Sequence, residues 1–275
     1  MGRISRILAD TFVFDIDGTL VDESLMISSK NRQALHLLNK KGYRLILASG
    51  RMLKAVRRFM EEQIGFCCPC ISYNGSILWV PENGIIAKTT IDSKIAVKVL
   101  DFLRKEGIHR QAYIDDQLFV EEDNDYVKSY CERSDITYTV VKDLIKLVEK
   151  RGESIKLLAI ATEEKLDAVK EKARELFGDC LEIFKSFPTY LDFVPKGVNK
   201  GYGLRKLSKE LGFSLYKTVA FGDNENDFEM LKEVGYPVVI GGASKKLINI
   251  SFMHDPNVKE GVYNVLKKIL PELFT

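Results

Sequence analysis

The chain has 275 residues, of which 45% are hydrophobic and 29% are charged, and its formal net charge is +2. This composition is that of an ordinary globular protein, and the length favours two domains. The near-neutral charge without a basic stripe argues against a nucleic-acid partner, and no apolar run approaches the ~18 residues of a membrane span. Residues 1–6 lead directly into the first predicted strand, so we expect no signal peptide and a cytoplasmic protein.

The first predicted element is a buried parallel strand over 12–14, which ends abruptly at Asp15 and Asp17. Ligands of an open α/β sheet bind at such carboxyl-terminal strand tips. Two carboxylates this close repel each other unless a cation lies between them, and Mg²⁺ prefers hard oxygen ligands. Taken alone, the same residues are also compatible with an acidic turn built around Gly18.

Alternating helix and strand signals follow at both ends of the chain. Ser28 or Ser29 is predicted to cap the start of one helix, and Gly212 is predicted to end a different, later helix. This alternation predicts a Rossmann-like parallel sheet with right-handed crossovers and helices on both faces. The remaining predicted elements are helices to about 41 and 64 and over 262–269, and strands over 44–48, 70–72, 218–221 and 237–240.

The middle of the chain has shorter strands beside two amphipathic helices. A hairpin is predicted over 112–120 with its turn at 115–117. The other predicted elements are helices over 93–106 and 162–177 and strands over 155–160 and 181–184. We therefore expect an inserted α+β domain over 85–187, and a core domain made of 1–84 and 188–275.

Four polar segments at strand ends or helix starts now stand in a recognisable order. They are Asp15–Thr19, Ala48–Arg51, Asn199–Gly201 and Gly222–Asp227. With these segments the chain resembles the haloacid dehalogenase superfamily of phosphatases, in particular its Cof-type branch. That branch carries a C2-type cap between its second and third motifs, at the place of the predicted insert. The chain departs from the branch at Gly241–Gly242–Ala243, where an asparagine usually replaces the second glycine.

The resemblance implies a catalytic group of Asp15, Asp17 and Lys200. Asp15 would be the nucleophile that forms an aspartyl-phosphate, and Asp17 would act as general acid and then as general base. Lys200 would cancel negative charge. The implied phosphate-binding residues are Ile16, Ser49, Gly50, Lys200 and Asn226.

The resemblance also implies a magnesium site made by Asp15, the backbone carbonyl of Asp17, and Asp223. Thr19 would steady the loop that holds Asp17, and Asp227 would orient Lys200 or a metal-bound water. Two residues keep simpler interpretations: Ser49 could be only a helix cap, and Arg51 could serve only the packing of a helix start.

We thus expect a Mg²⁺-dependent phosphatase that acts on a small phosphorylated metabolite, such as a sugar phosphate, and that works as a monomer. The alternatives are a phosphomutase on the same core and a phosphate-binding regulator without catalysis. The five cysteines lack the spacing of a zinc site and are expected to be reduced thiols. Cap residues that could line a substrate pocket are Tyr113, Asp115, Asp116, Lys185 and Tyr190, each of which could equally be a turn or packing residue.

Overall fold

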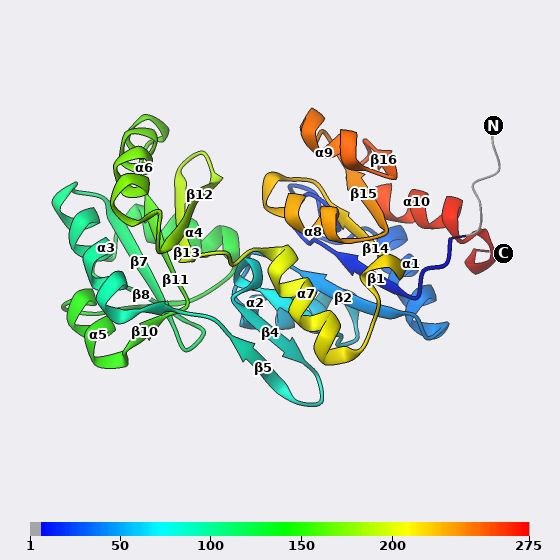
Figure 1. Ribbon diagram of the computed structural model, residues 1–275, viewed down its shortest axis with the longest axis horizontal. Coiled ribbons are helices and arrows are strands. Elements are labelled where there is room, and N and C mark those ends of the chain that lie inside the picture. Colours follow the sequence, from blue (N-terminus) through cyan, green and yellow to red (C-terminus); the bar gives the residue numbers. More distant parts are fainter. Residues whose placement is uncertain (1–6, 275) are drawn as a thin grey trace. The chain divides into compact units, whose positions relative to one another are not determined.

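The computed structural model describes residues 7–274, which divide into two compact units (Figure 1). The first unit contains the chain up to Gly50, the range Val56–Ile86, and the chain from Asn199 onward. The second contains Arg51–Ala55 and Ala87–Val198. Residues 1–6, expected to lead directly into the first strand, lie outside the described residues.

An eight-stranded sheet forms the centre of the first unit, in the order β16-β15-β14-β1-β2-β3-β4-β5. The strands from β16 to β3 are parallel, and β4 runs antiparallel to β3. Val13 of β1 lies between Ile46 of β2 and Ala220 of β14. The strands are β1 Thr11–Phe14, β2 Arg44–Ala48, β3 Cys70–Ser72, β4 Ile77–Val80, β5 Gly84–Lys88, β14 Thr218–Gly222, β15 Tyr236–Ile240 and β16 Met253–Asp255.

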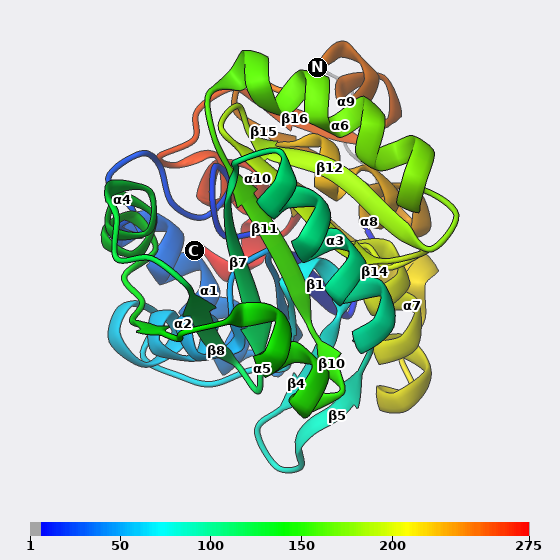
Figure 2. The ribbon, with the colours of Figure 1, turned by 90° about the vertical axis from the view of Figure 1, so that its left-hand side faces the viewer.

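Helices cover both faces of this sheet, as predicted. Helices α1 and α10 pack together on one face, and α7 and α8 pack together on the other (Figures 1 and 2). The buried strands β1 and β14 carry apolar residues at nearly every position because both faces are covered. The helices are α1 Ser29–Lys40, α2 Leu53–Phe59, α7 Lys200–Leu211, α8 Phe228–Glu233, α9 Lys245–Ile250 and α10 Gly261–Ile269, with a π-helical turn Met60–Ile64 after α2 and 3₁₀ turns at Tyr73–Gly75, Leu215–Lys217, Glu225–Asp227 and Pro271–Leu273.

The second unit is an α+β domain with a six-stranded sheet in the order β12-β13-β11-β7-β8-β9. Its pairs are antiparallel except for the parallel pair β8–β9, and β6 and β10 form a separate short ribbon. Its elements are β6 Ile91–Asp92, α3 Ser93–Lys105, β7 His109–Ile114, β8 Gln117–Val120, α4 Asp125–Ser134, β9 Tyr138–Val140, α5 Leu144–Arg151, β10 Glu153–Ser154, β11 Lys156–Ile160, α6 Glu163–Phe177, β12 Leu181–Phe187 and β13 Tyr190–Pro195.

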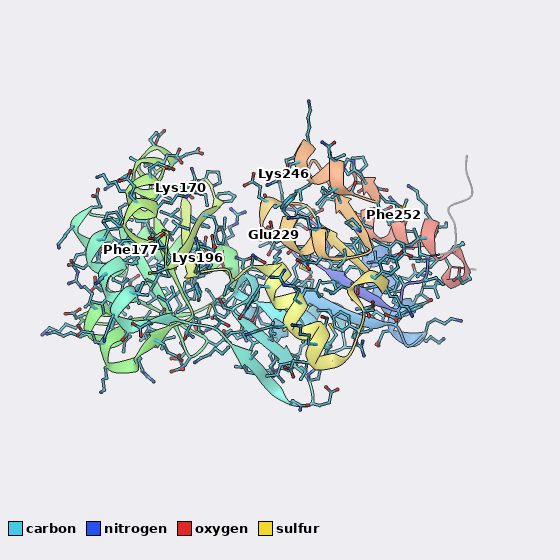
Figure 3. The ribbon with its side chains drawn as sticks, viewed as in Figure 1. Lys170, Phe177, Lys196, Glu229, Lys246 and Phe252 are labelled. Atoms are coloured by element: carbon cyan, nitrogen blue, oxygen red, sulfur yellow. The ribbon has the colours of Figure 1, made fainter. Side chains whose placement is uncertain are left out.

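One apolar core holds this second unit together. Helices α3, α5 and α6 bury their apolar faces against one side of the sheet (Figure 2). Phe102 of α3 meets Phe177 of α6 edge to face, with ring centroids 5.8 Å apart; Phe177 is labelled in Figure 3. The predicted hairpin is confirmed: β7 and β8 pair antiparallel, and Asp115 and Asp116 form its turn with φ of 50° and 56°.

The predicted return to the core after residue 187 is wrong, because the chain leaves the second unit only after Val198. The physical reason is the strand β13, which lies between β12 and β11 and hydrogen-bonds to both. A strand in the interior of a sheet cannot be assigned to a different domain. Pro188–Tyr190, predicted to begin the second core segment, instead joins β12 to β13 and begins β13.

Candidate active site

The carboxyl-terminal ends of neighbouring parallel strands gather the predicted site residues in the first unit. Asp15 follows β1, Ser49 follows β2, and Asp223 follows β14, which lies beside β1. Lys200 begins α7, and Asp227 ends the 3₁₀ turn after β14. Residues far apart in the sequence therefore meet at one edge because the strands that precede them are parallel and adjacent.

Asp15 is 4% exposed and lies directly beyond the last residue of β1. Its backbone N–H donates to the carbonyl of Phe221 at 3.0 Å, which continues the pairing with β14. Burial raises the pKa of Asp15 well above its usual value, and the carboxylate of Asp227 raises it further. Lys200 opposes both effects, so the ionised form of Asp15 depends on cationic neighbours.

Lys200 is only 1% exposed and joins two carboxylates. Its Nζ donates to Asp15 Oδ1 at 2.5 Å and to Asp227 Oδ1 at 2.6 Å. Burial by itself would lower the pKa of Lys200, but the two carboxylates outweigh it and raise the pKa, which favours the charged ammonium form. The helix start is fixed by Asn199, whose side chain accepts from the Tyr202 N–H at 2.8 Å.

Asp227 is fully buried, and both of its oxygens are engaged. Oδ1 accepts from Lys200, and Oδ2 accepts from the backbone N–H groups of Asp223 and Asn224 at 3.0 and 3.1 Å. Asp227 therefore fixes Lys200 and the turn after β14 at once.

A possible metal site lies where carboxylate oxygens of Asp15, Asp223 and Asp227 come within 4.8 Å of one another. Burial and the charge of Asp227 raise the pKa of Asp223 to about 6. Crowded, buried oxygen donors of like charge suit a hard divalent cation such as Mg²⁺. Both oxygens of Asp227 already accept hydrogen bonds from Lys200 and the turn after β14, so Asp15 and Asp223 are the side chains that fit this ion better.

Asp17 and Thr19 occupy different positions in the loop after β1. Asp17 is exposed and its carboxylate lies outside the acidic cluster, so only its backbone carbonyl can serve the predicted metal site. The Thr19 hydroxyl is buried and donates to Asp223 Oδ1 at 3.3 Å. Thr19 thus connects its loop to Asp223, a contact that the sequence did not reveal.

The predicted phosphate-binding residues reach the same strand edge. Ser49 is 1% exposed, and its backbone N–H still pairs with β3 through Ile71. The side chain of Ile16 is fully buried and its carbonyl accepts backbone N–H groups, so any phosphate contact must come from its own N–H. Asn226 donates from Nδ2 to Asn74 Oδ1 at 3.2 Å. In the loop after β15, where the chain differs from the Cof-type branch, Gly241 and Gly242 have no side chains and offer only backbone groups.

Sequence reasoning gave no role to Asn74. In the second unit it also missed the buried pair of Lys156 and Asp192, to which Ser186 donates a further hydrogen bond. The partners lie on adjacent strands β11 and β13, so a single sequence gives no local sign of the pair.

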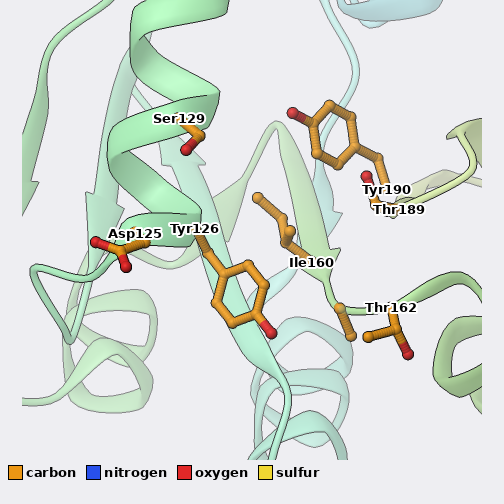
Figure 4. A pocket seen from close by; sticks show the side chains of 8 residues that line it. Asp125, Tyr126, Ser129, Ile160, Thr162, Thr189 and Tyr190 are labelled. Carbon is orange, nitrogen blue, oxygen red and sulfur yellow. The ribbon is translucent and has the colours of Figure 1, made fainter.

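The candidate cap residues lie in different structural environments. Tyr113 is fully buried and donates to Tyr130 at 2.7 Å, while Lys185 pairs with acidic side chains of α6. Asp115 and Asp116 form the hairpin turn. Tyr190 alone among these candidates lines a pocket of about 350 Å³ between α4, the end of β11 and the start of β13 (Figure 4). The pocket is lined by Asp125, Tyr126, Ser129, Ile160, Ala161, Thr162, Thr189 and Tyr190.

Two further expectations concern the whole chain. All five cysteines lie among the described residues and are free thiols, as expected. None of the helices in the described part of the chain is long and apolar enough to cross a membrane.

Comparison with known proteins gives one consistent result. The family model described as haloacid dehalogenase-like hydrolase matches residues 12–266. A 5-amino-6-(5-phospho-D-ribitylamino)uracil phosphatase of Bacillus subtilis is 25% identical, with 92% of each chain covered. A crystal structure from Thermotoga maritima is 39% identical with a TM-score of 0.86, covering 95% of this chain and 97% of the other. A structure described as a subclass IIB sugar phosphatase is 25% identical with a TM-score of 0.80, covering 94% and 98%.

Proposed function

Because this chain belongs to the haloacid dehalogenase-like hydrolases, we propose that it is a Mg²⁺-dependent phosphatase that hydrolyses a small phosphorylated metabolite through an aspartyl-phosphate. The observation that carries the proposal is the buried ammonium of Lys200 between Asp15 and Asp227, next to Asp223. A structural ion pair needs only one carboxylate for one lysine. The surplus of negative charge here fits a site that is completed by a metal cation, which can then help to bind an anionic phosphate.

Asp15 is the proposed nucleophile. One of its oxygens is held by Lys200, and the other attacks phosphorus while the bond to the leaving oxygen breaks. Asp17 protonates that oxygen with its exposed side chain, which is not part of the acidic cluster of Asp15, Asp223 and Asp227. Water then attacks phosphorus as Asp17 accepts its proton, which releases inorganic phosphate and regenerates Asp15.

The proposed magnesium ligands are Asp15, the Asp17 carbonyl and Asp223. Bound there, Mg²⁺ supplies positive charge that offsets the negative charge of the transferring phosphoryl group. Lys200 contributes a second, fixed positive charge, which Asp227 holds in place. Ser49, the Gly50 and Ile16 N–H groups and Asn226 are proposed to bind the phosphoryl oxygens.

We propose that the second unit acts as a cap and selects the leaving group. The pocket with Tyr126 and Tyr190 offers aromatic and apolar surface with a few hydroxyl groups, which suits a small organic leaving group such as a sugar (Figure 4). A sugar phosphate is consistent with the sugar phosphatase named above, and a phosphorylated ribitylamino compound is the named substrate of the Bacillus relative. The free thiols support a cytoplasmic location. We also propose a monomer that binds neither nucleic acid nor membrane.

The test is phosphate release from p-nitrophenyl phosphate and from a panel of metabolite phosphates, with Mg²⁺ and with EDTA. We expect Mg²⁺-dependent release that Asp15→Asn abolishes. A well-folded protein that releases no phosphate from any compound would refute hydrolysis and favour a silent phosphate-binding regulator. Transfer of phosphate between two positions of one sugar, without release, would instead favour a phosphomutase.

A further inference from the structure

The turn after β3 has an unusual backbone. Tyr73, Asn74 and Gly75 all have positive φ, at 51°, 53° and 109°, and all three are buried. Left-handed conformations are unfavourable for residues with a side chain, and asparagine is among the few that adopt them readily. Such a conformation persists only where its surroundings fix it, so the contacts of this turn indicate its purpose.

The turn contacts two of the segments that carry the proposed chemistry. The Asn74 N–H donates to the carbonyl of Ser49 at 3.0 Å. A methyl group placed on Gly75 would lie 2.2 Å from the carbonyl oxygen of Asn199, the residue before Lys200, so the two backbones touch there. The turn therefore connects the loop after β2 with the start of α7.

The side chain of Asn74 reaches a third segment. Its Oδ1 accepts a hydrogen bond from Asn226 Nδ2 at 3.2 Å, although 152 residues separate the two. Asn74 is 3% exposed, so the contact is shielded from water. Its side-chain nitrogen lies close to Gly50, at 3.1 Å from a methyl group placed there. The Asn74 amide thus lies between Gly50 and Asn226.

The direction of this hydrogen bond determines what Asn226 can do. An asparagine amide presents two N–H donors on one side and one oxygen on the other. Because Asn74 Oδ1 accepts one N–H, the Asn226 amide is held with its nitrogen toward Asn74, whose own amide lies beside Gly50. Without Asn74 the amide could turn over and present its oxygen, which would repel a phosphoryl group.

We propose that Asn74 is a positioning residue that holds the Asn226 amide as a donor to the phosphoryl oxygens. The inference rests on the proposed phosphatase function and adds to it a residue to which neither the motifs nor the comparisons assign a role. The competing explanation is that Asn74 only satisfies the left-handed turn.

Asn74→Gly separates the two explanations, because glycine accepts the left-handed backbone without strain and removes only the amide. We measure kcat and KM for p-nitrophenyl phosphate, the affinity of the Mg²⁺-loaded protein for inorganic phosphate, and Tm. We expect kcat/KM and phosphate affinity to fall about fivefold, the effect of one lost hydrogen bond, together with whatever modest fall in Tm the loss of a buried amide causes. Asn83→Gly, in the exposed turn between β4 and β5, is the matched control and should change none of these.

A double-mutant cycle with Asn226→Ala completes the test. If Asn74 acts through Asn226, Asn74→Gly has no further effect on phosphate affinity once Asn226 is alanine. An undiminished fivefold loss in that background, or a fall in Tm with phosphate affinity unchanged, would overturn the inference. A wild-type protein that neither binds phosphate nor hydrolyses any phosphomonoester would refute the proposed function itself, and the inference would fall with it.

Discussion

Lys200 Nζ lies 2.5 Å from Asp15 Oδ1, although 185 residues separate them in the chain. Both side chains are almost completely buried. Such a pair costs much desolvation free energy, so its presence at a strand end is better explained by chemistry than by stability. Because Asp227 shares the same ammonium, removing Lys200 leaves two buried carboxylates without their cation.

Lys200→Met is therefore expected to abolish activity and to lower the free energy of unfolding by about 3–5 kcal/mol at neutral pH without metal. The pKa of Asp15 is already raised in the folded state, and without Lys200 it rises further. A raised folded-state pKa means that stability is lost as pH increases, so the deficit should shrink as pH falls and the carboxyls are protonated. Urea unfolding in EDTA at several pH values measures this.

The exposed Lys196 provides the matched control for this variant. It lies 3.6 Å from Glu182 at the surface, and Lys196→Met should change stability by less than about 0.5 kcal/mol (Figure 3). A Lys200→Met protein as stable as wild type at neutral pH would show that the buried carboxylates do not need their cation.

Asp15→Asn should lower kcat by at least about 1,000-fold while the protein stays folded, because an amide cannot form the acyl-phosphate. Lys200 keeps Asp227 as its partner in this variant, so no buried charge is left without an oppositely charged neighbour. Circular dichroism and Tm check the fold, and phosphate release checks the activity. Near-normal turnover by a folded variant would show that Asp15 is not the nucleophile.

Much of the core could be predicted from sequence because its signals are local. The apolar run before Asp15 identifies a buried strand whichever neighbours it has, and parallel strands place their ends together. Two structural relationships could be identified only in the folded structure. The contact of Asn74 with Asn226 joins distant loops. The strand over 190–195 belongs to the second unit only because β11 and β12 flank it, so its sequence alone did not reveal the domain boundary.

Short elements on the surface also could not be predicted from local sequence patterns. The edge strand β16 has three residues and includes the exposed His254, so it lacks the apolar run that identified β1 and β14. Its place follows from pairing with β15, which supplies the hydrogen bonds. The β-propensity of so short a segment is too weak to distinguish a strand from a loop.

Activity should require a divalent cation, with Mg²⁺ effective and Ca²⁺ poor or inhibitory. Ca²⁺ takes more ligands at longer distances, so it would displace Asp15 from its position relative to phosphorus. Metal should also raise Tm more at pH 8 than at pH 5, because the pKa of Asp223 is about 6 and the ionised carboxylate binds metal. Full activity after exhaustive dialysis against EDTA would contradict the proposed metal site.

Asp17→Asn should harm poor leaving groups more than good ones. An alkoxide needs a proton as the P–O bond breaks, whereas p-nitrophenolate leaves readily without one. The variant should therefore accumulate phospho-enzyme with p-nitrophenyl phosphate more than with a sugar phosphate, since the water attack still lacks its base. Rapid-quench trapping of the labelled enzyme measures both amounts. An equal loss of the phosphorylation step for the two substrates would exclude Asp17 as the acid.

The proposed cap role predicts how the core behaves alone. A chain that joins Ile86 to Asn199 through a short Gly-Ser linker removes residues 87–198, shortens the edge strand β5 by its last two residues, and leaves the rest of the sheet and the acidic cluster within one unit. If the removed unit excludes water and selects the leaving group, the shortened chain should lose kcat/KM for small metabolites by at least about tenfold and accept bulky aryl phosphates better. The same chain carrying Asp15→Asn controls for contaminating phosphatases. A folded, active core with the metabolite preference of the full chain would place specificity outside residues 87–198.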